Sequence, residues 1–390
     1  MITALHLRNF KCFQDLDLPL NKLTLLTGFN AAGKSTVLQT ILLLAQTLRT
    51  DSRSGRLRLN GTLVRLGSPG DVINQKQGGT NLTLGAETEA VDVRWSFRVD
   101  DDEDRRSLKI ESILIRTPEG SRSLDRAGDV LGLMPCTPEA EPAGALIDLL
   151  AQAVFVSAVR QTDTEVYPVP DDPKPVNANV GSFGEYAAWW LHQVDDLDIA
   201  AGRCLQGSAS PRTLRGQVNA WASEFFPGAE VNAQPIPDTG LMRLQLRTSR
   251  TDNWRRPSNI GYGLTYAFPV LVAGLCAAPG QLLIVDSPEA HLHPRGQSRM
   301  GCFLAQAATG GQILLETHSD HVLNGIRLAV RGGLIAPADV SIYFFDSNAA
   351  DPTVSQVARL LVDKNGNLDH WPAGFFDQSE KDLANLAGWD

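Results

Sequence analysis

A short stretch near the start of the chain holds a lysine, a serine and two glycines at a spacing that suits phosphate binding. Gly28 and Gly33 enclose the pattern G-x-x-x-x-G-K-S, which ends in Lys34 and Ser35. The glycines let the backbone curl so that successive N–H groups point at phosphate oxygens. Lys34 supplies a mobile positive charge for β- and γ-phosphates, and the Ser35 hydroxyl is placed to ligate Mg²⁺. The predicted nucleotide-binding residues of this loop are Asn30, Ala31, Ala32, Gly33, Lys34, Ser35 and Thr36.

The segments on either side of this loop have the order that a phosphate-binding loop needs. Leu23–Leu26 is predicted to be a buried strand, and Ser35–Leu48 a long apolar helix. The partial positive charge at the helix N-terminus would lie at the same phosphates. A chance Gly/Lys turn is the alternative, and the agreement of strand, loop and helix disfavours it. The sequence therefore predicts a nucleotide-binding protein.

A candidate second half of the site lies far downstream. Leu282–Val285 is a hydrophobic run that ends in Asp286, and such a carboxylate is the usual partner of a P-loop, placed beside the Mg²⁺ held by Ser35. Without the P-loop, a strand simply capped by an aspartate would explain the pattern. Because Lys34 and Asp286 are so far apart, the nucleotide domain must be split around an insertion, with both ends of the chain in one sheet.

Acid–base residues follow Asp286 closely. Glu289 is a candidate to orient and polarise the attacking water. His318 follows a second predicted strand, Gln312–Glu316, where it could bond the γ-phosphate; a core histidine bonded to backbone is the alternative. His291 and His293 could share a metal ion on one face of an extended segment, but nothing nearby completes a ligand set.

A small-residue loop precedes the predicted helix Tyr266–Ala277. Gly261, Gly263 and Thr265 lie in this loop, and a helix N-terminus binds anions. One P-loop already serves the phosphates of a chain, so the second loop is most easily explained if it caps the nucleotide of a partner subunit. A helix-capping turn would fit the bare pattern equally well.

Size and composition restrict the class of protein. A chain of 390 residues that is 43% hydrophobic can bury a large core, and its length suggests two or three domain-sized units. No run of about eighteen uncharged apolar residues occurs, and the chain begins in a strand pattern rather than a signal peptide, so we expect no membrane association. The five cysteines are scattered without a C-x-x-C pair, which favours a cytoplasmic location and disfavours disulfides or zinc.

Charge gives little support for nucleic-acid binding. The formal net charge of −9 provides no general attraction to DNA. A local basic face, for example Arg53, Arg56, Arg58 and Arg65, would be needed, and a solvated edge explains the same arginines. DNA is therefore kept only as a candidate partner.

Strand and helix patterns divide the chain into three segments. Residues 1–115 and 256–390 carry α/β patterns, and the first includes an antiparallel meander over residues 56–98. Residues 116–255 are punctuated by Pro, Gly and acidic residues and lack sustained heptads, so we expect a mostly helical insertion without a long coiled coil. The expected class is α/β, a P-loop NTPase head with a mixed central sheet and flanking helices, split by this insertion.

Six motifs occur together in one order: Leu7–Lys11, the Asn30-bearing P-loop, Gly261–Thr265, Asp286–Pro294, Glu316–Ser319 and Trp371–Asp377. Together they resemble the RecF/SMC-like branch of ABC-type ATPases. Within it, the likeness is closest to bacterial single-headed ATPases related to the OLD (overcoming lysogenization defect) proteins. It covers about residues 1–115 and 256–390 and is weak in the insertion.

The resemblance implies an ABC-type, ATP-gated dimer of head domains. Lys34, Ser35 and Asp286 match the P-loop and Walker B positions of the family. The family's signature loop, which acts on the partner's nucleotide, would be Gly261–Thr265, and His318 would be the switch histidine.

Other positions are less regular. Gln75 or Gln77 matches the loop glutamine that senses Mg²⁺ in this family. Many relatives carry a glutamate directly after the Walker B acid, where this chain has Ser287, and a seryl hydroxyl cannot act as a carboxylate base. Either Glu289 takes over that role or hydrolysis is slow. Ala31 also replaces a frequent glycine.

The OLD-type likeness raises the question of an effector. Such relatives often carry a C-terminal metal-dependent nuclease domain, but no clustered acidic site is left after Asp286. We therefore predict no nuclease in this polypeptide and expect a separate effector protein to supply any cleavage or toxicity. By analogy, such heads serve in bacterial anti-phage defence or DNA maintenance.

Two functions stay open at this point. The leading one is an ATPase whose heads pair around ATP as a homodimer or higher oligomer and drive or gate a partner. The alternative is a slow or inactive ATPase that acts as an ATP-bound scaffold or sensor for a separate effector. A transporter motor is disfavoured, because transporter ATPases place the signature loop and Walker B strand much closer to the P-loop.

Overall fold

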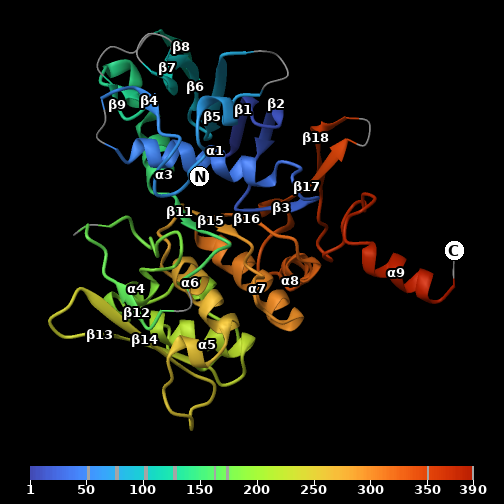
Figure 1. The fold of residues 1–390 in the computed structure, drawn as a ribbon. Coiled ribbons are helices and arrows are strands. Elements are labelled where there is room, and N and C mark those ends of the chain that lie inside the picture. Colours follow the sequence, from blue (N-terminus) through green and yellow to red (C-terminus); the bar gives the residue numbers. More distant parts are fainter. Residues whose placement is uncertain are drawn as a thin grey trace.

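The computed structural model describes residues 1–50, 53–74, 79–100, 104–125, 130–161, 164–172, 175–348 and 351–388. Its centre is a six-stranded sheet in the order β11-β15-β16-β3-β17-β18 (Figure 1). The first five strands pair parallel, and β18 pairs antiparallel with β17. The strands are β11 (Val154–Val156), β15 (Leu282–Asp286), β16 (Gln312–Glu316), β3 (Leu23–Gly28), β17 (Val340–Asn348) and β18 (Asp351–Leu360). The P-loop strand and the strand that ends in Asp286 therefore share one sheet, with β16 between them.

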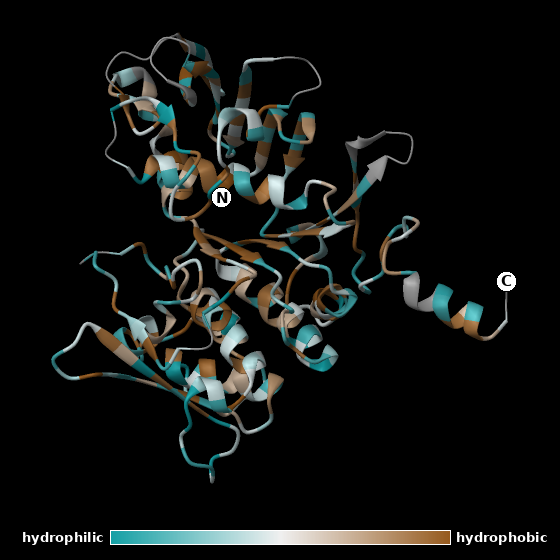
Figure 2. Cartoon of the chain, in the orientation of Figure 1, coloured by the Kyte–Doolittle hydropathy of each residue, from teal (hydrophilic) through white to brown (hydrophobic). Residues whose placement is uncertain are grey.

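Alternating side chains of the central strands build two hydrophobic cores. In β16, Ile313 and Leu315 belong to one core, and Leu314 belongs to the other. Successive residues of a strand point to opposite faces, so a strand that is apolar at every position must be covered on both sides. Figure 2 shows this continuous apolar character across the middle of the molecule.

Helices cover both faces of the central sheet. α1 and α3 pack into the core that contains Leu314, and α6, α7 and α8 pack into the core that contains Ile313 (Figure 1). The helices are α1 (Lys34–Leu48), α2 (Pro69–Val72), α3 (Gly144–Ala151), α4 (Ala187–Gln193), α5 (Leu214–Phe225), α6 (Tyr262–Cys276), α7 (Pro294–Ala307), α8 (Asp320–Arg331) and α9 (Gln378–Leu386). In the part of the chain that the structure describes, no helix is long and apolar enough to cross a membrane.

The predicted antiparallel meander forms a second sheet, which packs against the same core as α1. Its order is β2-β1-β5-β6-β7-β4, with β8 paired to β7. The strands are β1 (Ala4–Phe10), β2 (Phe13–Pro19), β4 (Arg56–Leu57), β5 (Asn81–Glu87), β6 (Asp92–Asp100), β7 (Asp104–Thr117) and β8 (Gly120–Asp125).

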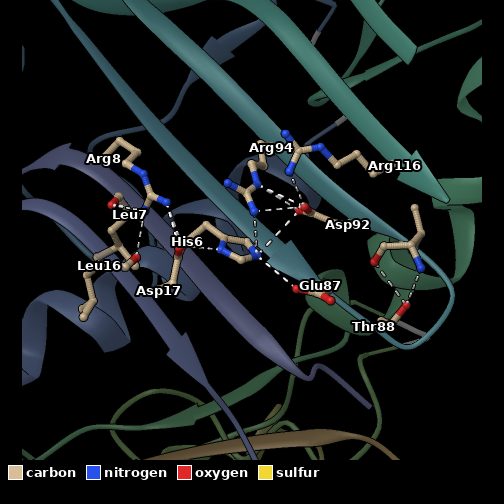
Figure 3. A network of polar contacts seen from close by, with 11 residues as sticks. His6, Leu7, Arg8, Leu16, Asp17, Glu87, Thr88, Asp92, Arg94 and Arg116 are labelled. Atoms are coloured by element: carbon tan, nitrogen blue, oxygen red, sulfur yellow. Dashed lines mark hydrogen bonds and ion pairs between the residues drawn. The ribbon is translucent and has the colours of Figure 1, made fainter. Parts of the chain in front are cut away.

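A buried histidine ties four strands of this second sheet together (Figure 3). The His6 side chain is 5% exposed; its Nδ1 lies 2.5 Å from Asp17, and its Nε2 lies 3.3 Å from Glu87 and 3.6 Å from Asp92. Among the described residues, His6, Glu87 and Asp92 form the one group with metal-ligand spacing. Arg94 lies 3.0 Å from Asp92 and already supplies a cation there, so the group is a salt-bridge network rather than a metal site.

The head extends beyond residue 115, where the sequence placed its first boundary. The expected boundary falls inside β7, and β8 then completes the antiparallel sheet. Further along, α3 packs on α1 and β11 forms the edge of the central sheet. A three-residue edge strand such as β11 carries too little periodicity to be recognised in a sequence. The short strands β9 (Val130–Leu131) and β10 (Met134–Pro135) pair with each other between these elements.

The rest of the expected insertion combines helices with a sheet. α4 and α5 lie beside a three-stranded sheet, β12-β14-β13, made of Val166–Pro168, Leu241–Arg247 and Glu230–Pro235. α5 packs against α6 and α7, so this layer rests on the helical face of the head (Figure 1).

Candidate nucleotide-binding site

A cavity of about 350 Å³ opens where the P-loop, the start of α1 and the end of β16 meet. Its volume is in the range of small-molecule and cofactor sites. In parallel α/β sheets, ligands bind at the carboxyl ends of the strands, and this cavity lies at the carboxyl ends of β3 and β16. The lining residues are Lys11, Cys12, Asn30, Ala31, Gly33, Lys34, Ser35, Thr36, Gln39, Glu316 and His318.

Two glycines give the loop its shape. Gly28 has φ +130°, and a Cβ atom there would lie 2.1 Å from the backbone oxygen of Phe345. Gly33 has φ +102°, and its Cβ would lie 2.5 Å from the Phe13 ring. Side chains at either position would thus clash as well as strain the backbone. α1 starts directly after Gly33 with no acidic residue in its first turn, so the helix N-terminus is left available to an anion.

Lys34 is folded back onto its own loop. Its side-chain nitrogen donates to the backbone oxygens of Gly28 at 2.9 Å and Phe29 at 2.6 Å, and the residue is 3% exposed. Burial lowers the pKa of Lys34, while the charges of Glu316 and Asp286 act in the opposite direction. Phosphate oxygens entering the cavity would offer this ammonium group a better acceptor than two carbonyls.

Glu316 is a site residue that sequence reasoning missed. Its Oε1 accepts a hydrogen bond of 3.0 Å from the Ser35 hydroxyl, and the residue is 4% exposed. Its other oxygen, Oε2, is buried with no hydrogen-bond partner among the described residues. Burial and the nearby charge of Asp286 raise the pKa of Glu316 to about 7, against the Ser35 bond and the charge of Lys34. The sequence signal that could have identified Glu316 is its position as a carboxylate at the end of an apolar strand.

Asp286 lies at the same sheet edge, one strand further from the P-loop. It pairs in register with Glu316, but it does not line the cavity, and its Oδ1 accepts a hydrogen bond of 2.8 Å from Ser287. The backbone turn that follows is held by the buried Arg160, which donates to the backbone oxygens of Asp286 at 2.8 Å and Ser287 at 3.2 Å. Ser287 has φ +48°, a strained value for a non-glycine residue.

Both carboxylate oxygens of Glu289 are already engaged. Oε2 accepts from the Thr317 hydroxyl at 2.6 Å, and Oε1 accepts from the backbone N–H of His318 at 2.9 Å. Glu289 therefore fastens the turn after β15 to the segment after β16, and His318 lines the cavity wall beside it. Burial and the charge of Lys34 lower the pKa of His318, while Glu289 and Asp286 act in the opposite direction. The lowered pKa favours the neutral imidazole, which can donate one hydrogen bond.

Three protein families match separate parts of the chain. An AAA ATPase domain matches residues 1–122, and an AAA domain of the AbiEii toxin type (Type IV TA system) matches residues 215–324. The two matches hold the P-loop and the Asp286 motif respectively, so one domain is split between them. The matches thus give the chain an AAA/ABC-type ATPase domain in two parts. Residues 335–386 match a family of unknown function, DUF3696.

The chain is also similar to a curated relative in sequence and to solved structures in fold. The OLD nuclease of Thermus scotoductus is 24% identical over 345 residues, which cover 82% of the ATPase head and 59% of that relative. The head thus spans about three fifths of the relative's length. The Smc head domain of Pyrococcus furiosus, solved bound to the C-terminal domain of ScpA, has a TM-score of 0.51 at 13% identity and covers 99% of both chains. The SMC head domain of Thermotoga maritima has a TM-score of 0.43 at 11% identity, covering 93% of this chain and 99% of that one. The predicted SMC-like P-loop fold is confirmed.

The predicted signature loop is the first turn of a helix in the ATPase head. α6 begins at Tyr262, ahead of the predicted start, with Gly261 as its N-cap at φ +94°. A Cβ at Gly263 would lie 2.7 Å from the Phe226 ring. Thr265 is 2% exposed, so its side chain faces the protein interior. None of these residues lines the P-loop cavity of the same chain, and only Gly261 and Tyr262 present exposed surface at this turn.

The remaining candidate residues are two glutamines and two histidines. Gln75 and Gln77 lie outside the described residues. His291 packs between two tyrosines, with its ring centroid 5.5 Å from that of Tyr262 and 4.3 Å from that of Tyr266. His293 caps α7 instead, accepting from the backbone N–H of Arg295. The two imidazoles have different partners, which leaves the metal alternative without support.

Three further residues of the loop were predicted to bind nucleotide, and two of them line the cavity. Asn30 and Thr36 line the cavity, whereas Ala32 is 2% exposed and does not.

Of the arginines considered for DNA, Arg56 forms an ion pair of 2.8 Å with the buried Asp100. That pairing reduces the charge which the basic edge presents.

Proposed function

We propose that this head binds ATP with Mg²⁺ in the P-loop cavity and hydrolyses it. The observation that carries the proposal is the convergence of Lys34, Ser35, Glu316 and His318 on one cavity at the N-terminus of α1. A lysine, a helix N-terminus and a neutral imidazole favour a polyphosphate there. The chain's match to AAA ATPase domains supports the same substrate.

The residues around Ser35 fit a magnesium ion. Ser35, Glu316 and Asp286 offer only oxygen atoms, which hard divalent cations prefer, and Glu316 Oε2 is buried without a protein partner among the described residues. Bound Mg²⁺ would neutralise charge on the β- and γ-phosphates. Gln75 would join this set only if its undescribed segment reaches the cavity.

The remaining roles follow from the contacts. Lys34 would exchange its two carbonyl acceptors for phosphate oxygens, and His318 would donate its ring N–H to the γ-phosphate. Water attacks the γ-phosphorus while the bond to the β–γ bridging oxygen breaks, which yields ADP and phosphate. We assign Glu289 to holding His318 in place, because both of its oxygens are occupied.

The test is ATP binding and turnover by Lys34→Ala. We expect binding of a fluorescent ATP and phosphate release both to fall to background, because the variant removes the cavity's phosphate-binding cation. Arg256→Ala serves as a control, since its exposed ion pair with Glu165 lies outside the cavity lining. Retention of full turnover by Lys34→Ala would remove the proposal.

The first turn of α6 supports ATP-dependent pairing of two heads as a homodimer or higher oligomer. Tyr262 is 53% exposed at a helix N-terminus, and it lines no part of its own chain's cavity. A partner's triphosphate could meet this turn. We expect a larger particle in light scattering with ATP-Mg²⁺ than without, and expect Tyr262→Glu to prevent it through charge repulsion. A single mass under both conditions would contradict the pairing.

A second candidate function is an ATP-bound scaffold or sensor that holds a separate effector protein. Ser287 at the position after the Walker B acid, and a Glu289 with no free oxygen, favour slow turnover. The OLD nuclease relative and the ScpA-bound Smc head make an effector or a bound partner protein in anti-phage defence or DNA maintenance the natural setting. Turnover measured with and without DNA separates the two; a high basal rate removes the scaffold.

A further inference from the structure

The last residue of β16, Glu316, is a carboxylate hydrogen-bonded to the P-loop serine. We propose that Glu316 is a positioning residue of the magnesium site: it accepts a hydrogen bond from the Ser35 hydroxyl and leaves its second oxygen for a magnesium-bound water. The inference rests on the proposed function, and it assigns to Glu316 the contact that the Walker B aspartate was expected to make.

The hydrogen bond that Ser35 donates fixes the direction of its hydroxyl proton. A serine that ligates a cation does so through an oxygen lone pair, so its proton must point to another acceptor. Here that acceptor is Glu316 Oε1, 3.0 Å from Ser35 Oγ. Asp286 has no bond to Ser35 in the described structure, and its Oδ1 accepts from Ser287 at 2.8 Å. The hydroxyl is thus already turned as a metal ligand requires.

The second carboxylate oxygen of Glu316, Oε2, is buried without a partner among the described residues. Glu316 is 4% exposed and lines the cavity, and Oε2 has no donor within hydrogen-bond distance among the described residues. A buried, unpaired carboxylate oxygen is costly unless a ligand or water satisfies it. The nearby ammonium of Lys34 does not fill this role, since it donates to two backbone oxygens of its loop. A water held on a divalent cation would satisfy the oxygen.

The order of the strands fixes the position of the Glu316 carboxylate. β16 lies between β15 and β3, and Glu316 pairs in register with Leu26 of the P-loop strand on one side and Asp286 on the other. A carboxylate at this register sits between the P-loop and the Walker B end. A purely structural tie between α1 and β16 would use the same Ser35 bond, but it would need no second, unsatisfied oxygen.

The experiment measures how nucleotide binding depends on Mg²⁺. A fluorescent ATP is titrated into wild type, Glu316→Gln and Glu316→Asp at a series of free Mg²⁺ concentrations and in EDTA. We expect Glu316→Gln to raise the half-saturating Mg²⁺ concentration by about 10- to 100-fold, as for other outer-sphere partners of metal sites. Binding in EDTA should be unchanged or tighter, because a negative charge next to the phosphates is gone. Glu316→Asp keeps the charge and should give a smaller rise.

Controls separate this result from misfolding and from failure of the proposed function. Glu185→Gln changes another partly buried glutamate, which accepts from the backbone N–H of Phe183, and it should leave the Mg²⁺ dependence unchanged. In a Ser35→Ala background the further effect of Glu316→Gln should shrink, since the two residues act through one bond.

The outcomes are distinguishable. An identical Mg²⁺ dependence of wild type and Glu316→Gln overturns the role of Glu316 while leaving ATP binding intact. If Glu316→Gln unfolds, the Glu316→Asp titration decides, and no shift there has the same meaning. Loss of nucleotide binding in EDTA by Glu316→Gln, with an unchanged melting temperature, would make Glu316 a nucleotide contact instead. Failure of wild type to bind ATP at all would remove the proposed function itself.

Discussion

Asp286 and Glu316 are register partners at the carboxyl ends of neighbouring parallel strands. Two carboxylates at one sheet edge repel each other, and burial together with Asp286 raises the pKa of Glu316 to about 7. The nearby ammonium of Lys34 offsets part of this repulsion. The arrangement becomes favourable when a cation lies between the acids, and the proposed magnesium-bound nucleotide would provide one.

The pair leads to a prediction for Asp286→Asn. The amide oxygen can still accept from Ser287, so the fold should be preserved. We expect ATP turnover to fall by about 10²-fold or more while ATP still binds, because the proposed magnesium site loses a negatively charged oxygen ligand. Phosphate release and fluorescent-ATP titration measure the two quantities. Loss of both ATP binding and turnover would show that Asp286 supports the shape of the P-loop and is not a residue of the magnesium site.

Glu289 and Thr317 should act as one unit. Glu289→Gln replaces an acceptor by an amide nitrogen, and Thr317→Val removes the donor of the 2.6 Å bond. Each change frees the segment that carries His318, so we expect turnover to fall by about 10-fold in either variant, with the double variant little worse than each single one. Steady-state rates of the three variants test this.

The opposite pattern would identify a catalytic base. If Glu289 activated water directly, Glu289→Gln would lose far more turnover than Thr317→Val, and the effects of the two changes would multiply. Thr317→Ser keeps the hydroxyl and is the matched control. It should behave like wild type, because its donor atom is unchanged.

Local patterns were enough to predict the P-loop, the strand before Asp286 and most of the head. The loop shows its function in a few adjacent residues, and β16 was predicted with its observed bounds, Gln312–Glu316. The role of Glu316 was not predictable in that way. Only the order β15-β16-β3 shows which strand end lies against Ser35, and strand order depends on contacts between distant segments.

The first turn of α6 shows a different limit. Its residues were predicted as a small-residue loop before a helix that would begin at Tyr266. The helix nevertheless includes Gly263, because the Phe226 ring packs where a side chain would be. As a result Thr265 turns inward, and the exposed surface of this turn is left to Gly261 and Tyr262.

Arg160 should couple α6 to the turn after Asp286. It is 3% exposed and donates to the backbone oxygens of Asp286 and Ser287, and its guanidinium carbon lies 5.6 Å from the Tyr266 ring centroid. Burial lowers the pKa of Arg160 to about 10, partly offset by Asp286 and Glu289, so it stays charged at pH 7. We expect Arg160→Met to lower the free energy of unfolding by about 2 kcal/mol or more, since buried carbonyls lose their donor.

Arg160→Lys tests whether charge alone suffices. A lysine cannot present the planar fork that spans two carbonyls and stacks on an aromatic ring, so we expect only partial recovery of stability and turnover. Chemical denaturation and phosphate release give both quantities. Full recovery with lysine would show that the positive charge near Asp286, and not the guanidinium geometry, is what the turn requires.

The His6 network predicts how stability depends on pH. Burial alone would raise the pKa of Asp17, but hydrogen bonds from Arg8 and His6 outweigh it and lower the pKa from 3.8 to about 2. A carboxyl group with a lowered pKa in the folded state contributes stability at pH values above 3.8. That contribution is lost as the pH falls toward 2, where the unfolded chain binds a proton that the folded chain does not.

Asp17→Asn should therefore be less stable than wild type at pH 7, and the difference should vanish toward pH 2. Because the Asp17 side chain is 52% exposed, solvent screening keeps the difference below about 1 kcal/mol. Urea unfolding followed at several pH values between 7 and 2 measures it. Asp15→Asn is the matched control, since Asp15 also pairs with Arg8 but is more exposed, at 69%, and has no bond to His6. A difference that stays constant from pH 7 to pH 2 would mean that Asp17 acts through packing and not through its charge.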